Sequence, residues 1–165
     1  MTPEGRLQTS AQTLRIARRM EDALGRAETD MIPHLHEGST WRGNQGCGAR
    51  RGVDGFVCGW QRHFRAAFAD RVDHTEQFIV DGDWAACFGY HVATDRGPFM
   101  GAARTGQRMR IPYMDFWRVA DGRIADTPVF VGFGSALAQL GHDVFGSHGW
   151  EISDHGDDAA SNSTT

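Results

Sequence analysis

Apolar residues recur at helical spacing in two stretches of the first half of the chain, residues 9–32 and residues 53–72. In the first stretch, the apolar positions of one helical face are Leu14, Ala17, Met20 and Leu24. In the second stretch, four aromatic side chains step by four residues down one face, and they are Phe56, Trp60, Phe64 and Phe68. The pattern predicts two amphipathic helices, and Thr9 or Ser10 can cap the start of the first.

From residue 72 onward the pattern changes to runs that are typical of β-strands. These runs are "VDHTEQFIVDGDW", "WAACFGYHVATD", "MRIPYMDFWRV" and "RIADTPVFVGFG". Asp-Gly pairs separate the first run from the second and the third from the fourth, which favours antiparallel hairpins. Before them, a short strand is expected at residues 40–42 in a glycine-rich segment, and "SALAQLGHDVFG" predicts a short closing helix.

The order of these elements is helix, helix, sheet and helical end, which indicates an α+β fold with helices on one face of an antiparallel sheet. A strongly curved sheet covered by helices encloses a cone-shaped cavity, and Gly89, Gly132 and Gly134 are candidates for the bends. We expect one domain over residues 1–152. Residues 153–165 carry no large apolar side chain and are expected to form a disordered tail.

Composition narrows the range of partners. The chain has 165 residues and a net charge of −4, so a basic face for nucleic acid is not expected. No apolar run approaches the length needed to span a membrane, and no signal-peptide core is seen. The spacing of the three cysteines fits neither a zinc nor a redox motif, and their odd number argues against a disulfide framework. A cytoplasmic protein is expected.

A carboxylate lies inside the apolar run that ends at Trp117. Because side chains alternate along a strand, Asp115 shares a face with Tyr113 and Trp117. On the preceding strand His91 and Asp95 share a face, and the three polar residues converge if both faces point inward. Burial raises the pKa of a carboxyl group, so such a site suits general acid–base chemistry without a cofactor.

Less specific interpretations stay open at this stage. Asp115 can be a structural carboxylate held by backbone donors or by an arginine such as Arg118 or Arg123, and His91 can be an ordinary partly buried histidine. The pair His34 and His36 invites a metal site, but a third ligand would have to come from elsewhere in the fold. We expect no metal and no cofactor.

Three segments resemble the SnoaL-like polyketide cyclases of the nuclear transport factor 2-like superfamily. They are "MIPHLHEGSTWRGNQGCG", "GPFMGAARTGQRMRIPYMDFWRVADGRIAD" and "AQLGHDVFGSHGWE". The resemblance implies a cone-shaped α+β barrel, commonly dimeric, that closes a polyketide ring by an intramolecular aldol reaction without a cofactor. It assigns the acid/base role to Asp115. Asp95 stands where many relatives have a histidine, which leaves another cyclisation, an isomerisation or a hydrolysis open.

The resulting hypothesis is a cyclase or isomerase in which Asp115 moves the proton and His91 or Asp95 tunes or relays it. A second group of residues is expected to shape the pocket, namely His36, Trp41, Trp60, Phe64, Tyr113, Trp117 and Phe130. The alternative is a binding module of the same fold that captures a small molecule without chemistry. Met114 and Phe116 on the outer sheet face favour a homodimer or a higher homo-oligomer.

Overall fold

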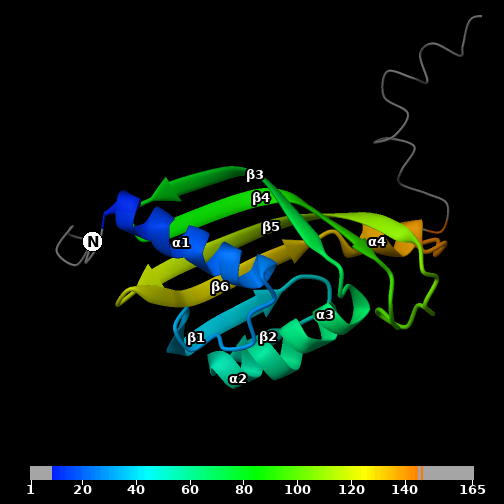
Figure 1. Ribbon diagram of the computed structural model, residues 1–165, viewed down its shortest axis with the longest axis horizontal. Helices are drawn as coiled ribbons and strands as arrows, with labels where there is room; N and C mark the ends of the chain where they lie inside the picture. The colour runs from blue at the N-terminus through cyan, green and yellow to red at the C-terminus, as the bar shows by residue number, and fades with distance from the viewer. Residues whose placement is uncertain (1–8, 145, 147–165) are drawn as a thin grey trace, which may run out of the picture.

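The computed structural model describes residues 9–144 and 146, and it forms a six-stranded curved sheet with helices over its concave face (Figure 1). The helical elements are α1 (Ser10–Gly25), α2 (Gly52–Phe56), the π-helix η1 (Val57–Gln61), α3 (Arg62–Ala67) and α4 (Phe133–Gln139). The strands are β1 (Leu35–Gly43), β2 (Ala49–Arg51), β3 (Val72–Asp81), β4 (Trp84–Thr94), β5 (Arg108–Ala120) and β6 (Arg123–Val131). The expected α+β architecture is confirmed, while the predicted tail lies outside the described residues.

The strand order is β2-β1-β6-β5-β4-β3, so the sheet is open, with β2 and β3 at its edges. The hairpins β3–β4 and β5–β6 are antiparallel, as predicted. Asp121 and Gly122 both have positive φ angles, 49° and 73°, which a tight two-residue hairpin turn requires.

One pairing differs from the predicted antiparallel sheet, because β1 runs parallel to β6. Leu35 is paired with Ile124 and Gly43 with Val129, across a large separation in the sequence. No local turn sets the relative direction of two such distant strands, so no turn signal could reveal it. Strand β2, which pairs antiparallel with β1, was also not predicted.

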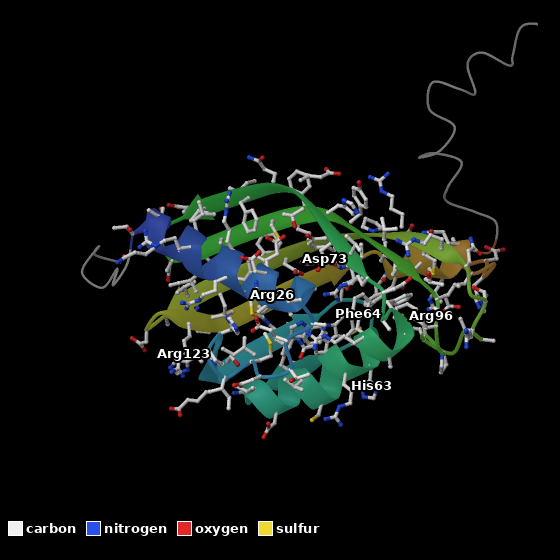
Figure 2. The ribbon with its side chains drawn as sticks, in the orientation of Figure 1. Arg26, His63, Phe64, Asp73, Arg96 and Arg123 are labelled. Carbon is white, nitrogen blue, oxygen red and sulfur yellow. The ribbon has the colours of Figure 1, made fainter. Side chains whose placement is uncertain are left out.

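The helices cover the sheet in two places. Helix α1 begins with a capping box between Thr9 and Gln12 and packs across β3, β4, β5 and β6 (Figure 1). The second predicted helix is present, but the π-turn η1 divides it into α2 and α3. Figure 2 shows Phe64 of α3 directed toward the sheet, whereas the exposed His63 next to it points away.

The core lies between these helices and the concave face of the sheet. Strand β5 alternates as predicted, with Ile111 and Trp117 buried on the inner side and Met114 on the exposed outer side. Burial of such large apolar side chains supplies most of the folding free energy. Within the described residues, the outer side of β5 carries exposed side chains such as Met114, so the sheet has one face for the core and one that is open for contact.

Gly89 marks a close approach of two strands, at the register shift between Thr75 and Gln77 of β3. A Cβ atom at Gly89 would lie 2.1 Å from the backbone oxygen of His74. Gly132 is similarly tight, with a Cβ position 2.6 Å from Cγ of Pro112. The prediction that Gly134 marks a bend of the sheet is wrong, since it lies in α4.

We expect Gly89→Ala to lower the free energy of unfolding by about 1–3 kcal/mol, because the backbone of β3 must shift to admit the methyl group. Gly25→Ala is the matched control. Gly25 ends α1 and no atom lies within 4 Å of its Cβ position, so alanine there leaves stability unchanged or slightly raised. Urea denaturation of both variants measures the difference, and equal stabilities would contradict the close-approach explanation.

Candidate functional site

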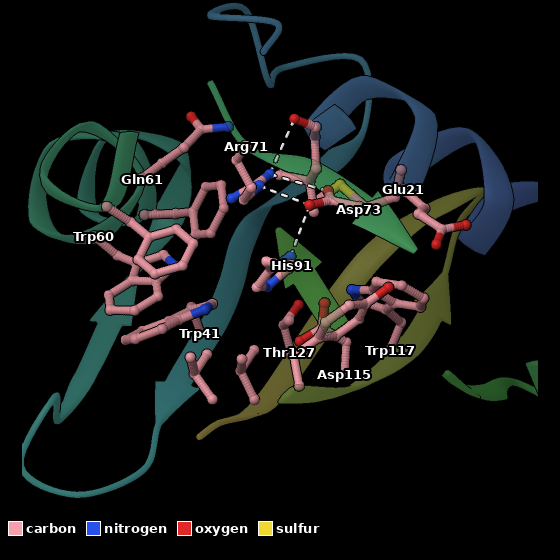
Figure 3. A pocket seen from close by; sticks show the side chains of 17 residues that line it. Glu21, Trp41, Trp60, Gln61, Arg71, Asp73, His91, Asp115, Trp117 and Thr127 are labelled. Atoms are coloured by element: carbon pink, nitrogen blue, oxygen red, sulfur yellow. Dashed lines mark hydrogen bonds and ion pairs between the residues drawn. The ribbon is translucent and has the colours of Figure 1, made fainter. Parts of the chain in front are cut away.

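A cavity lies between α1, η1 and the concave face of the sheet (Figure 3). The space inside it that water can occupy is about 50 Å³, which is enough for a few water molecules. A larger ligand can therefore enter only if side chains of the wall move. The lining residues are Met20, Glu21, Leu24, Trp41, Phe56, Trp60, Gln61, Phe64, Arg71, Asp73, His91, Tyr113, Asp115, Trp117, Thr127, Val129 and Val131.

Aromatic rings form one wall of the cavity. Trp41 of β1 stacks on Trp60 of η1 with ring centroids 4.6 Å apart, and Trp60 stacks on Phe64 of α3 at 5.1 Å. Trp41 and Phe64 are buried, while Trp60 is half-buried. Flat, apolar faces of this kind suit a planar, ring-containing ligand, and Trp60 is the member of the stack with room to move.

Asp73 of β3 organises the polar side of the cavity. Its carboxylate is 2.7 Å from Nδ1 of His91 and 2.8 Å from Nε of Arg71. Burial raises the pKa of Asp73, but the hydrogen bond from His91 and the charge of Arg71 outweigh it, so the pKa is lowered and the carboxylate stays ionised. An ionised acceptor at Nδ1 fixes the tautomer of His91, with the proton on Nδ1 and a lone pair on Nε2.

His91 is held rigidly as well as oriented. Its ring stacks on Tyr113, with centroids 4.2 Å apart and planes within 7°. The hydroxyl group of Tyr113 is in turn 2.6 Å from Oγ1 of Thr75. Burial lowers the pKa of His91, while the bond to Asp73 opposes this, so the imidazole is predominantly neutral at pH 7. A neutral ring with a free Nε2 lone pair can accept a proton or a hydrogen bond from a ligand.

Asp115 occupies the middle of β5, paired with Cys87 and Val129, and its side chain faces the cavity (Figure 3). None of the described residues gives its carboxyl group a hydrogen bond or an ion pair. Burial raises its pKa to about 7, and the charge of Arg71 only partly opposes this. Near neutral pH both protonation states are therefore populated, which is the condition for a group that takes up and returns a proton.

A second acid with a raised pKa lies on α1. Glu21 is the ionisable residue beside the buried Ala17 and Met20, and it borders the same cavity. Burial raises its pKa to about 7, and the nearby Asp73 carboxylate adds to the effect. Two carboxyl groups with raised pKa values and one ionised carboxylate thus share a small space.

The structure brings together seven of the ten residues predicted for the site. These residues, which all line the cavity, are Trp41, Trp60, Phe64, His91, Tyr113, Asp115 and Trp117. His91 and Asp115 do not contact each other. The register pairs His91 with Ile111 and Asp115 with Cys87, so they are separated by roughly 13 Å of strand. A direct proton relay between them is not supported by this arrangement.

The other three predicted residues lie outside the cavity. Asp95 is fully buried past the end of β4, where it accepts hydrogen bonds from the backbone and hydroxyl of Thr105. His36 is near the surface, with Nδ1 accepting from the backbone N–H of Gly38. Phe130 points to the outer face and is 54% exposed, because its neighbours in β6 take the inward positions.

Five polar residues of the cavity were missed by the sequence reasoning, and they are Glu21, Gln61, Arg71, Asp73 and Thr127. Alternation along β3 does not reveal Asp73, because Phe78 and Val80 reach its inner face only through the bulge between Thr75 and Gln77. Glu21 could have been found, since it is a glutamate beside the apolar positions of α1. No sequence signal reveals Gln61, because the π-turn changes the helical phase.

Within the described residues, no three His, Cys, Asp or Glu side chains are grouped closely enough to hold a metal ion. The two histidines that suggested such a site have other contacts. Nε2 of His34 lies 3.0 Å from a carboxylate oxygen of Glu28, and His36 faces Asp121 at 3.8 Å. In the same part of the chain, no helix is long and apolar enough to cross a membrane.

Comparison with known proteins gives one family match, to the SnoaL-like polyketide cyclase model over residues 14–140. A candidate SnoaL-like polyketide cyclase from Jannaschia sp. CCS1 superposes with a TM-score of 0.70 at 18% identity, covering 85% of this chain and 95% of that one. IdmH of Streptomyces antibioticus, a candidate polyketide cyclase, superposes with a TM-score of 0.69 at 20% identity. The match covers 79% of this chain and 99% of IdmH. AclR of Streptomyces galilaeus, a candidate hydroxylase, superposes with a TM-score of 0.70 at 21% identity. The match covers 81% of this chain and 87% of AclR.

At these identities the structural likeness establishes the shared fold and no more. No curated protein matches the chain significantly. The neighbours also differ in the reaction assigned to them, cyclisation in one case and hydroxylation in another. The chemistry of this cavity therefore has to be argued from its own residues.

The raised pKa of Asp115 makes stability depend on pH. Between the pKa of the unfolded carboxyl, 3.8, and the folded value of about 7, the folded state binds more protons, so stability falls as pH rises through this window. We expect Asp115→Asn, which stays neutral, to match the wild type at pH 4 and to exceed its free energy of unfolding at pH 8 by about 1–4 kcal/mol.

Denaturation curves at the two pH values measure this difference, and NMR titration of the carboxyl carbon measures the pKa directly. Asp54→Asn, at an exposed position of α2, is the control and should leave the pH dependence unchanged. A measured pKa near 4 for Asp115 would contradict the electrostatic description of the site.

Proposed function

The chain belongs to the SnoaL-like polyketide cyclase family, and we propose that it is a cofactor-independent cyclase or isomerase of a polyketide-like intermediate. The observation that carries this proposal is the environment and the pKa of the Asp115 carboxyl group. Its carboxyl group has no partner among the described residues, has a pKa raised to about 7, and faces a cavity with an aromatic wall. A structural carboxylate would instead be ionised and hydrogen-bonded, as Asp73 is.

The proposed chemistry is an intramolecular aldol closure. The ionised Asp115 removes a proton from a carbon that lies between two carbonyl groups, and an enolate forms. The enolate carbon bonds to the carbon of a ketone in the same molecule, and the electrons of that C=O bond move to its oxygen. The protonated Asp115 then gives its proton to this oxygen. Acid and base are restored, and no electrons leave the substrate.

The other polar residues support this step in distinct ways. Nε2 of His91 can accept a hydrogen bond from a substrate hydroxyl group, and Asp73 and Arg71 keep the ring in the tautomer that does so. Glu21, when protonated, can donate to a carbonyl oxygen. Asp95 has no part in this proposal because it lies outside the cavity.

A second candidate function is a module that binds a small ligand without chemistry. The observation in its favour is the small volume of the cavity, about 50 Å³, which in this conformation fits only a very small occupant. The two candidates differ in whether a bound carbon acid exchanges its proton. A passive pocket has no need of the raised pKa of Asp115.

Asp115→Asn tests the proposed chemistry. The probe is an aromatic β-keto ester with a ketone placed to close a six-membered ring, and both ring closure and hydrogen–deuterium exchange at the acidic carbon are followed by NMR. We expect turnover to fall about 10²- to 10⁴-fold in Asp115→Asn, because the residue that moves the proton is lost. Asp121→Asn should react like the wild type.

Equal rates in Asp115→Asn and the wild type would remove this residue from the mechanism. Binding of the probe to the wild type without exchange or closure would support the binding module instead. Circular dichroism of each variant verifies that the fold is retained.

We also propose that the protein is a homodimer formed through the outer face of the sheet. Phe88, Met114 and Phe130 are neighbours on adjacent strands of this face, and each is more than a third exposed. A contiguous exposed apolar surface of this kind is typical of an interface. The three free cysteines further support a reducing, cytoplasmic location.

Phe130→Asp tests the dimer, because a charge placed within the apolar face opposes association. We expect the wild type to sediment as a dimer in analytical ultracentrifugation and Phe130→Asp to sediment as a monomer. Ile32→Asp is the matched control, since Ile32 is an equally exposed apolar residue that precedes β1, away from this face. A monomeric wild type would rule out this interface.

A further inference from the structure

Gln61 is a buried polar side chain whose amide has no hydrogen-bond partner within the described part of the chain. It is only 5% exposed, its Nε2 atom is inaccessible to solvent, and it forms part of the cavity wall. A buried donor without an acceptor costs free energy, and such groups are rare in folded proteins. Its position therefore needs an explanation other than stability.

The π-helix η1 places Gln61 in the wall. The backbone N–H of Arg62 donates to the carbonyl oxygen of Val57, a spacing of five residues in place of four. The wider turn allows the consecutive residues Trp60 and Gln61 both to face the cavity, which a regular α-helix, with about 100° between neighbours, disfavours.

Arg50 of β2 holds the π-turn from outside. Its Nε donates to the carbonyl oxygen of Gly59 at 3.2 Å. Its side chain also lies directly against this residue, since a Cβ at Gly59 would be 2.5 Å from Cδ of Arg50. The wide turn is thus supported by specific contacts, and the orientation of Gln61 is built into the fold.

Figure 3 shows Gln61 at the same end of the cavity as Arg71 and separated from Asp115. The charge of Arg71 is already balanced by Asp73, at 2.8 Å. This end therefore offers an unpaired N–H donor without an unpaired charge. Its complement is a neutral acceptor such as a carbonyl oxygen, because a carboxylate would bring a buried charge without a counterion.

We propose that the Gln61 amide anchors the ligand by donating its Nε2–H to a carbonyl oxygen remote from the carbon that Asp115 deprotonates. A polar contact at each end of the molecule fixes its length and its direction in the cavity, so Gln61 determines specificity. The inference rests on the proposed function in one respect, which is that the cavity is the ligand site.

The test uses two probe ligands of the same shape, 1-tetralone and 1-methylenetetralin, in which a C=CH₂ group replaces the carbonyl. Dissociation constants are measured by quenching of tryptophan fluorescence. We expect the ratio of the two constants to shift toward the alkene by about 3- to 10-fold in Gln61→Leu, because the ketone loses its donor. Gln77→Leu, at an exposed glutamine of β3, should leave the ratio at its wild-type value.

Thermal unfolding separates this role from a structural one. Gln61→Leu removes an unpaired buried donor, so its Tm should equal or exceed that of the wild type. A lower Tm together with an unchanged ligand ratio would show that the amide serves the fold, and it would overturn the proposal. An unchanged ratio at any Tm, or a wild type that binds neither probe, would also overturn it.

The same ratio measured in Asp115→Asn keeps the two proposals distinct. We expect the wild-type ratio there, because the carbonyl anchor does not depend on the acid. The turnover test can therefore fail while the ligand ratio still shows the Gln61 contact. Equally, the protein can catalyse ring closure without that contact. Loss of the preference for the ketone in Asp115→Asn would place the carbonyl at Asp115 and overturn the assignment to Gln61.

Discussion

The site depends on one carboxyl group that is largely shielded from bulk water and has no compensating partner among the described residues. Asp115 projects from the concave side of β5 into a small cavity, and burial raises its pKa to about 7. The cavity exists because the sheet curves under α1 and η1, and because the aromatic side chains do not fill the space between these helices and the sheet. A flatter sheet would bring the helices into contact with β5, or would admit bulk water, and in either case the proton of Asp115 would not be exchangeable near neutrality.

The distribution of charge keeps Asp115 unpaired. Among the described residues, Arg71 is the cation that borders the cavity, and its guanidinium is engaged by Asp73 at 2.8 Å. Asp73 also holds His91, so one ionised carboxylate binds both basic groups on that side. Had Arg71 reached Asp115 instead, the pKa of Asp115 would fall and the group would become a structural anion. Asp73 is ionised and Asp115 has a raised pKa because Asp73, and not Asp115, lies beside Arg71.

The local elements could be read from the sequence because local physics sets them. Alternation of apolar side chains identified β5 and the inward face of Asp115, and the Asp121-Gly122 pair identified the hairpin to β6. The second helix was predicted as one continuous element, because its aromatic side chains repeat every four residues. The interruption at η1 depends on contacts with Arg50, which comes from a strand that the pattern did not reveal.

The sequence by itself determined the class of fold, the strands that form hairpins, and the carboxylate that faces inward, since each follows from neighbouring residues. The tertiary structure decided which polar groups meet. His91 lies in the cavity and Asp95, four residues further along the same face, lies beyond it, because the cavity ends before β4 does. The parallel pairing of β1 with β6 and the entry of Glu21, Gln61, Arg71 and Asp73 into the site have the same origin. They depend on how distant segments pack, and no local pattern records that.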